Sequence, residues 1–289
     1  MIKLLFTLMM GYRLVAQYEF PLRAMDPARP DSSVKEKAFG YWLGRGEGDL
    51  SFGPNGIVVD SRGNIIVSDP VSWHFKVIRD GKIVKTVKPS NQVQVTKFSA
   101  TSIDDEDNIY LLGGGHLAVM RLTEDSLVML SYHNMHAKKV DGHNLHPVRF
   151  IMIDGKVYIT TGTPPKQDLV SVERNKFLLY SGDSLEKELK EKWNIQQPIY
   201  LLDVFRIEGE DVYFLKGYRL IWRVRKGKGV IDSLVEGSGI FTEGIAGGGF
   251  SCPVFVDKKG RIYVVDGDFD WNTKTGKVFI RIYEPEKED

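Results

Sequence analysis

Residues 57–69 read Ile-Val-Val-Asp-Ser-Arg-Gly-Asn-Ile-Ile-Val-Ser-Asp, and this stretch decides the fold. Two runs rich in β-branched residues flank the turn. The carboxylate of Asp60 is suited to accept hydrogen bonds from backbone amides, and Gly63 can adopt the positive φ that closes a hairpin. Residues 254–266, Val-Phe-Val-Asp-Lys-Lys-Gly-Arg-Ile-Tyr-Val-Val-Asp, repeat the pattern near the other end of the chain. The same hairpin at both ends predicts an all-β repeat protein.

Weaker copies of the hairpin lie between these two, at residues 101–112, 151–160 and 204–215. Successive turn acids are 44, 50, 54 and 49 residues apart; they are Asp60, Asp104, Asp154, Glu208 and Asp257. A period of about 40–50 residues is typical of a four-stranded β-propeller blade. The sequence therefore predicts a β-propeller of four-stranded blades, with five blades preferred and six as the alternative.

The last repeat needs a fourth strand from elsewhere, because only residues 278–283 follow its hairpin as a strand-like run. An N-terminal strand that joins this repeat would close the ring and remove its exposed edges. Residues 38–43 are the expected donor, and a strand over residues 12–20 would favour the six-blade alternative. We expect an N-terminal segment over residues 17–35 and a single propeller domain over residues 36–289.

Residues 37–69 resemble an NHL repeat, through Ala-Phe-Gly-Tyr-Trp-Leu-Gly at 38–44 and the hairpin that follows a glycine-rich connector. Residues 249–266 are a second good copy. The resemblance implies a propeller. It implies no single activity, because this family contains sensors, RNA binders, scaffolds and metal-dependent lyases or hydrolases.

Charge and cysteine content narrow the function classes. The chain has 289 residues with 39 basic and 38 acidic side chains, so it lacks the overall positive charge that favours nucleic acid, and we expect no nucleic-acid partner. Cys252 is the one cysteine in the sequence, which excludes an internal disulfide and a cysteine zinc cluster.

The N-terminus resembles a secretory signal. Lys3 precedes the apolar residues 4–10, and the small residue Ala16 follows at a suitable distance. We therefore expect a signal peptide over residues 1–16 and export to the periplasm or the extracellular space, with a cytoplasmic protein as the alternative. No apolar run approaches the roughly 20 residues of a transmembrane helix, so none is predicted.

The repeat pattern places the long connections on one face of the propeller, and binding residues usually lie on long loops of a rigid scaffold. Aromatic and imidazole side chains on this face are candidates to stack on or hydrogen-bond a ligand. The candidates are Trp73, His74, His116, Tyr132 and Trp271.

Two groups of side chains are candidate metal ligands. The double His-x-x-His pattern of His133, His136, His143 and His146 suits zinc, since neutral imidazole is a common zinc ligand. The alternative is a polar loop whose histidines are solvated or bonded to the backbone. Alternating oxygens of Asp266, Asp268 and Asp270 resemble the start of a calcium loop, although Lys277 stands where such a loop has a bidentate glutamate.

The preferred interpretation is a non-enzymatic binding or recognition propeller that engages a small molecule, glycan or protein through its long-loop face. It would be a monomer or part of an envelope assembly, and zinc or calcium is its only candidate cofactor. One alternative is a metal-dependent lyase or hydrolase that uses the loop histidines. Another is a structural interaction module of an envelope assembly. No catalytic triad or pair of carboxylates is recognisable in the sequence.

Overall fold

The structure is a computed structural model, and it describes most of the chain. The described residues are 11–24, 37–41, 53–54, 56–89, 100–124, 126–137, 139–140, 143–145, 147–163, 166–173, 176–193, 195, 204–216, 220–235, 254–270 and 272–286. Most of them lie in β-strands.

Two four-stranded antiparallel sheets follow one another along the chain. The first sheet contains β3 (Gly56–Val59), β4 (Ile65–Asp69), β5 (His74–Arg79) and β6 (Lys82–Val87). The second sheet contains β7 (Ala100–Ile103), β8 (Asn108–Gly113), β9 (His116–Leu122) and β10 (Leu127–Asn134). The first hairpin of each sheet is a predicted repeat, at residues 57–69 in the first sheet and at residues 101–112 in the second.

The third and fourth sheets have the same antiparallel order. The third contains β13 (Pro147–Ile153), β14 (Lys156–Thr163), β15 (Lys166–Glu173) and β16 (Lys176–Tyr180). The fourth contains β17 (Val204–Glu208), β18 (Asp211–Lys216), β19 (Leu220–Arg225) and β20 (Gly229–Val235). A short parallel pairing of Met152 with Arg206 and of Ile153 with Ile207 joins the two.

The closing sheet combines the two ends of the chain. It contains β21 (Val254–Val256), β22 (Ile262–Asp270), β23 (Thr275–Pro285), β1 (Tyr12–Ala24) and β2 (Phe39–Tyr41). The strand that pairs with β23 is β1, in antiparallel register from Tyr12 opposite Pro285 to Arg23 opposite Thr275. The expected donor, residues 38–43, was therefore wrong, because Phe39–Tyr41 pairs in parallel with the outer side of β1. Part of the expected N-terminal segment, residues 17–24, is thus a strand of this sheet.

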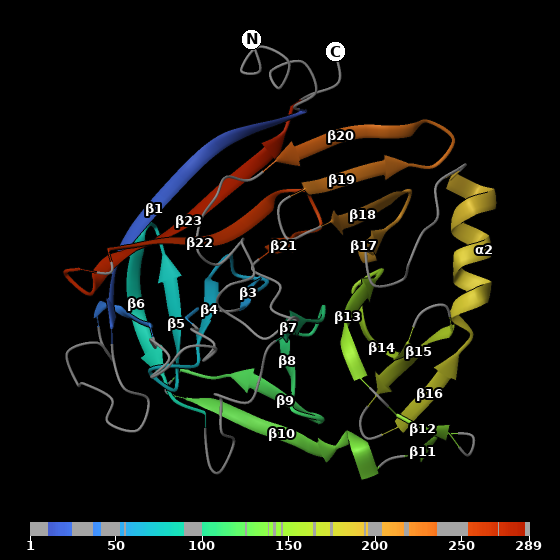
Figure 1. The fold of residues 1–289 in the computed structure, drawn as a ribbon, viewed down its shortest axis with the longest axis horizontal. Coiled ribbons are helices and arrows are strands. Elements are labelled where there is room, and N and C mark those ends of the chain that lie inside the picture. The colour runs from blue at the N-terminus through green and yellow to red at the C-terminus, as the bar shows by residue number, and fades with distance from the viewer. Residues whose placement is uncertain are drawn as a thin grey trace.

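The innermost strands of these sheets surround one axis (Figure 1). β3 contacts β7, β7 contacts β13, β13 pairs with β17, and β21 contacts β3. The Arg206 guanidinium completes the ring between β17 and β21, since its Nη1 donates to the Val256 carbonyl over 2.7 Å. Closed in this way, the fold is a β-propeller. The number of blades stays a prediction, because several connections between sheets lie outside the described residues.

Short elements fill gaps between the sheets. The helix α2 (Gly182–Trp193) buries Leu189 and Trp193 against the third and fourth sheets, in a cluster that includes Ile151 and Val212. The short 3₁₀ helix η2 (Met135–Ala137) and the pair β11 (Lys139–Val140) and β12 (His143–Asn144) follow β10. Among the described helices, none is long and apolar enough to cross a membrane.

Candidate functional site

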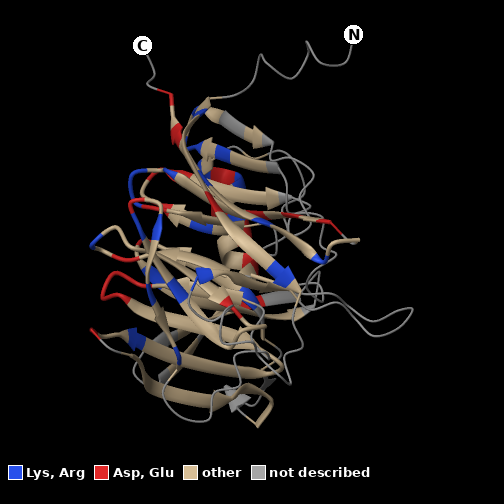
Figure 2. Cartoon of the chain, turned by 90° about the vertical axis from the view of Figure 1, so that its left-hand side faces the viewer, with Lys and Arg blue, Asp and Glu red and all other residues tan. Residues whose placement is uncertain are grey.

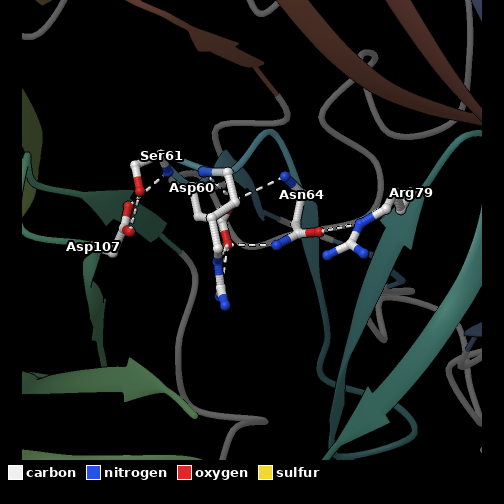
Figure 3. Close-up of polar contacts among 6 residues, drawn as sticks. Asp60, Ser61, Asn64, Arg79 and Asp107 are labelled. Carbon is white, nitrogen blue, oxygen red and sulfur yellow. Dashed lines mark hydrogen bonds and ion pairs between the residues drawn. The ribbon is translucent and has the colours of Figure 1, made fainter. Parts of the chain in front are cut away.

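The turns between the first and second strands of each sheet lie at one face of the propeller, which we call the hairpin-turn face. At Asp60 the carboxylate organises the turn (Figure 3). Its Oδ1 accepts the backbone N–H groups of Arg62 at 3.0 Å and Asn64 at 2.8 Å, and its Oδ2 accepts the Asn64 side-chain amide at 2.7 Å. The Asn64 amide oxygen in turn accepts Nε of Arg79 from β5 at 2.9 Å.

Two other turns repeat this arrangement. Oδ1 of Asp104 accepts the N–H groups two and four residues later, and so does Oδ1 of Asp257. The second oxygen of each carboxylate accepts a tyrosine hydroxyl, from Tyr110 at 2.8 Å and from Tyr263 at 3.3 Å. Burial raises the pKa of Tyr263, so its hydroxyl stays protonated and continues to donate.

The turns also bind to one another. Oδ1 of Asp107 accepts the Ser61 N–H at 2.7 Å, which joins the first and second sheets. Nζ of Lys258 reaches Oδ2 of Asp105 at 2.6 Å, which joins the closing and second sheets. Gly209 donates its N–H to Asp154 at 2.9 Å, which joins the third and fourth sheets. Loops with acidic and basic residues accordingly gather at one side of the molecule in Figure 2.

A cleft of about 410 Å³ opens on the hairpin-turn face, between the fourth sheet and the closing sheet. Most of its lining is charged. The lining residues are Glu208, Asp211, Tyr213, Arg223, Arg225, Lys258, Lys259, Gly260, Pro285 and Glu286.

Arg223 is the exceptional residue of this cleft. It lies in β19 directly opposite Tyr213 of β18, and its residue exposure is 6%. In each of the other sheets, the second-strand residue that corresponds to Tyr213 is a tyrosine or an isoleucine. It pairs with a buried residue of the third strand, and these third-strand residues are apolar or small. They are Val77, Val119, Ser171 and Ile282. The fourth sheet therefore places a buried charge at a position where the others place core or small residues.

Asp211 holds the arginines of the cleft in position. Its Oδ1 accepts Nε of Arg225 at 2.8 Å and its Oδ2 accepts Nη2 of the same guanidinium at 3.0 Å, a bidentate fork. Oδ2 of Asp211 also lies 3.5 Å from Nε of Arg223. Arg223 and Arg225 are two residues apart on one strand, so their side chains share a face of the sheet. One carboxylate thus forms a hydrogen-bonded fork with Arg225 and an ion pair with Arg223.

Gly260 forms the opposite wall of the cleft, in the Asp257 turn. Its φ is +77°, which a side chain rarely adopts. A Cβ at this position would lie 3.0 Å from Oη of Tyr213 and 3.7 Å from Nη1 of Arg223. The corresponding Gly63 of the first sheet, with a φ of +81°, would have nothing within 4 Å of its Cβ. The glycine in the closing sheet therefore lets this turn approach the Tyr213 hydroxyl and the Arg223 guanidinium closely, whereas Gly63 faces open space.

A second, smaller cavity of about 30 Å³ lies near the axis and is lined by residues of β7, β13, β17 and β21, among them Ser102, Arg149 and Arg206. It has room for about two water molecules. Arg206, which is 2% exposed, donates Nη2 to Glu208 at 2.5 Å. Its Nη1 lies 3.4 Å from the sulfur of Met152. Together with the Arg206 bond to the Val256 carbonyl, these contacts connect the innermost strands β13, β17 and β21, and this cavity is too small for an organic ligand.

The structure brings two of the predicted ligand-binding residues together. The Tyr132 hydroxyl lies 2.9 Å from Nδ1 of His116, and the two rings stack with centroids 5.4 Å apart. Trp73 lies in the turn before β5 with a φ of +61°, and Nδ1 of the next residue, His74, contacts the Ser72 carbonyl. Trp271 and Cys252 lie outside the described residues.

The predicted zinc ligands occupy different surroundings. His133 is buried in β10 with its ring edge-on to Phe177 of β16, at a centroid distance of 5.0 Å. His136 belongs to η2 and packs over Gly115. His143 is in β12, and His146 lies outside the described residues. In the part of the chain that the structure describes, no group of three or more His, Cys, Asp or Glu residues is placed to hold a metal ion. The zinc site stays a prediction.

The three predicted calcium ligands lie on a strand. β22 pairs regularly with β23 through Asp266, Asp268 and Asp270. Asp266 is buried, with its Oδ2 3.6 Å from Nη1 of Arg281. The Asn272 N–H donates to Asp270 at 2.8 Å and lowers the pKa of that carboxyl. The calcium site also stays a prediction.

Comparison with known proteins gives no matching protein-family model and no matching curated protein. The NHL resemblance therefore stays a prediction. A solved gluconolactonase-like protein is 9% identical, with a TM-score of 0.40, over 96% of this chain and 94% of its own. Virginiamycin B lyase from Staphylococcus aureus is 13% identical, with a TM-score of 0.35, over 81% of this chain and 67% of its own. Similarity at this level carries no information on ligand or activity.

Proposed function

We propose that this protein is a non-enzymatic, ligand-binding propeller whose ligand site is the cleft between the fourth sheet and the closing sheet. The observation that carries the proposal is the buried Arg223, at a position that is apolar or small in the other sheets. Removing a charge from water costs several kcal/mol even when it is paired, and a well-packed valine would avoid that cost. Local violations of the packing rule of a fold are expected at functional sites.

The chemistry of the lining favours binding over catalysis. Glu208 is engaged by Arg206, and Asp211 is engaged by Arg223 and Arg225. Carboxylates in such pairs orient arginines, and neither is arranged as a base beside a nucleophile, which an acyl-transfer or hydrolytic site requires. The volume of the cleft is in the range of small-molecule sites.

The proposed site lies on the hairpin-turn face and not on the face that loop lengths predict. The long connections of that other face include residues 236–253, which lie outside the described residues. The hairpin turns, in contrast, are held by hydrogen bonds within and between sheets, such as those that the backbone N–H groups of Lys259 and Arg261 donate to Asp257. A wall of this kind is already ordered before the ligand arrives, which reduces the entropic cost of binding.

A thermal-shift screen tests the proposal. Wild-type protein and Arg223→Val are each titrated with a panel of sugars, amino acids, organic acids and nucleotides. Valine is the residue of the first and second sheets at this position, so the variant is expected to fold, which circular dichroism verifies. A bound compound at about 100 times its Kd would stabilise the wild type by about 2.7 kcal/mol and the variant far less. Equal stabilisation of both proteins, or no hit across the panel, would overturn the proposal.

A further inference from the structure

We infer that the ligand of this cleft carries an oxyanion, a phosphate or carboxylate group, that binds between Arg223 and the Lys258-Lys259-Gly260 turn. The inference rests on the proposed function and names the class of ligand. It follows from three properties of the described residues: the charge balance of the cleft, the orientation of its guanidinium groups and the close approach of the Gly260 turn to Arg223.

The charge balance of the cleft is positive. Its lining contains four basic residues and three acidic ones, Glu208, Asp211 and Glu286. Glu208 is bound by Arg206, and Lys258 is bound by Asp105; both partners lie just outside the cleft. Arg206 adds one positive charge and Asp105 adds one negative charge, so the excess positive charge is unchanged when both are included. A bound anion would compensate it, and in a partly buried site that interaction is less screened by salt than on an open surface.

The guanidinium groups are arranged for an oxyanion. The bidentate fork with Asp211 fixes the plane of the Arg225 guanidinium. Arg223 lies beside the same carboxylate through Nε, and its Nη1 lies on the side of Gly260. Arginine is weakly hydrated and presents planar N–H donors that match carboxylate and phosphate oxygens. A guanidinium that is buried and held in this way has already lost much of the entropy that binding would cost.

Gly260 brings the lysine-bearing turn close to Arg223. A Cβ at this position would lie 3.0 Å from the Tyr213 hydroxyl and 3.7 Å from Nη1 of Arg223, so the turn lies against two polar groups and a side chain here would push it away from them. The two lysines that precede Gly260 bring positive charge to the same turn. The whole cleft, at about 410 Å³, is much larger than a phosphate ion. The ligand is therefore a small organic molecule that bears the oxyanion at one end.

The experiment measures anion binding by isothermal titration calorimetry at constant ionic strength, with inorganic phosphate in one arm and succinate in the other. Two pairs of variants isolate the site. Arg223→Val removes its arginine, and Arg121→Val removes an equal charge from the second sheet on the same face. Gly260→Ala adds backbone strain and a tight contact with the Tyr213 hydroxyl that pushes the lysine-bearing turn away from Arg223, and Gly63→Ala imposes the same backbone strain where no neighbour is within 4 Å.

We expect at least one anion to bind wild type, with the Kd raised at least tenfold by Arg223→Val and Gly260→Ala. Arg121→Val and Gly63→Ala should change it less than twofold. The tighter of the two anions identifies the oxyanion. Equal weakening by Arg121→Val would overturn the inference, since it would mean attraction by the face as a whole. If neither anion binds, but a neutral compound from the screen binds wild type and fails to bind Arg223→Val, the proposed function stands and the oxyanion is wrong.

Discussion

The backbone N–H of Gly40 in β2 donates a hydrogen bond to Oδ2 of Asp69 in β4 over 3.1 Å, which joins the closing sheet to the first sheet. The Ser72 hydroxyl donates to the same oxygen at 2.6 Å. Asp69 is fully buried, and so is Lys76, whose ammonium lies near it. Burial raises the pKa of Asp69, and the charge of Lys76 offsets only part of that effect.

This pair predicts how stability changes with pH. Because the pKa of Asp69 is raised in the folded state, its ionisation costs more free energy in the folded protein than in the unfolded chain. The stabilising effect of the protonated form is complete below the unfolded pKa of about 3.9 and is lost as the pH rises through the higher folded value. The stability of wild type relative to Asp69→Asn should therefore fall over this window and be constant above it. Urea unfolding from pH 3.5 to 8 measures the difference, and a rise with pH would contradict it.

The sequence predicts the hairpins well because their signals are local. Strands β3 and β4 coincide with residues 57–69, and β21 and β22 coincide with residues 254–266. Asp60 and Asp257 accept hydrogen bonds from amides only two and four residues away, so five consecutive residues determine each of these turns.

The closing strand was misplaced because its pairing is non-local. The partner of β1 is β23, more than 250 residues away, and nothing within residues 12–24 encodes that partner. Pro21 lacks a backbone N–H and is unfavourable within a strand. It is tolerated because β2 pairs only with Leu22–Ala24, so β1 is an edge strand at the proline. The helix α2 was also missed, although Leu185, Leu189 and Trp193 have helical spacing.

The candidate cleft was missed for a different reason. In the sequence, Arg223 and Arg225 resemble a charged hairpin end, which is usually solvated. Only the register of β18 with β19 shows that Arg223 occupies the position of Val77 and Val119. An alignment of the third strands by their distance from the turn acid would have indicated the exception, but the unequal turn lengths obscure that alignment.

Removal of the start of β1 should destabilise the protein. Tyr12 is buried in a cluster with Phe205, Val254 and Ile262, and residues 12–16 pair with β23. A chain that begins at residue 11, where the described residues start, is the reference. A chain that begins at residue 17 should lose about 3 kcal/mol, as for deletion of a large core side chain. That corresponds to roughly 5–10 °C for a protein of this size. Scanning calorimetry of the two chains makes the comparison, and equal melting temperatures would show that residues 12–16 do not contribute. The predicted signal cleavage after Ala16 would produce the less stable chain.

Loss of the Arg206 guanidinium should weaken the ring at the junction between β17 and β21. Within the described residues these two strands have no ladder pairing, and the Arg206 bond to the Val256 carbonyl spans them. Arg206→Met leaves that buried carbonyl without its donor and removes the ion pair with Glu208. We expect a loss of about 2–4 kcal/mol in urea unfolding. Arg206→Lys keeps the positive charge but lacks the two guanidinium donors. Its free energy of unfolding should therefore lie between those of wild type and Arg206→Met. An unchanged unfolding midpoint in Arg206→Met would contradict this role.

The bond between Ser61 and Asp107 allows the cost of a strained turn to be separated from the gain of a contact between sheets. Asp107 accepts the Ser61 N–H and hydroxyl at 2.7 and 2.6 Å, and its φ of +62° lies in the left-handed region where other hairpins have Gly63 and Gly260. Asp107→Ala loses both bonds and keeps the strain, so it should cost about 2 kcal/mol. Asp107→Gly loses the same bonds but relieves the left-handed backbone, and should be more stable than the alanine variant by about 1 kcal/mol. With Ser61→Ala one of the bonds is already absent, and Asp107→Ala should then cost about 1 kcal/mol less. Urea unfolding of the single and double variants gives each difference. A glycine variant as stable as wild type would mean that the contact contributes no more than the strain it requires.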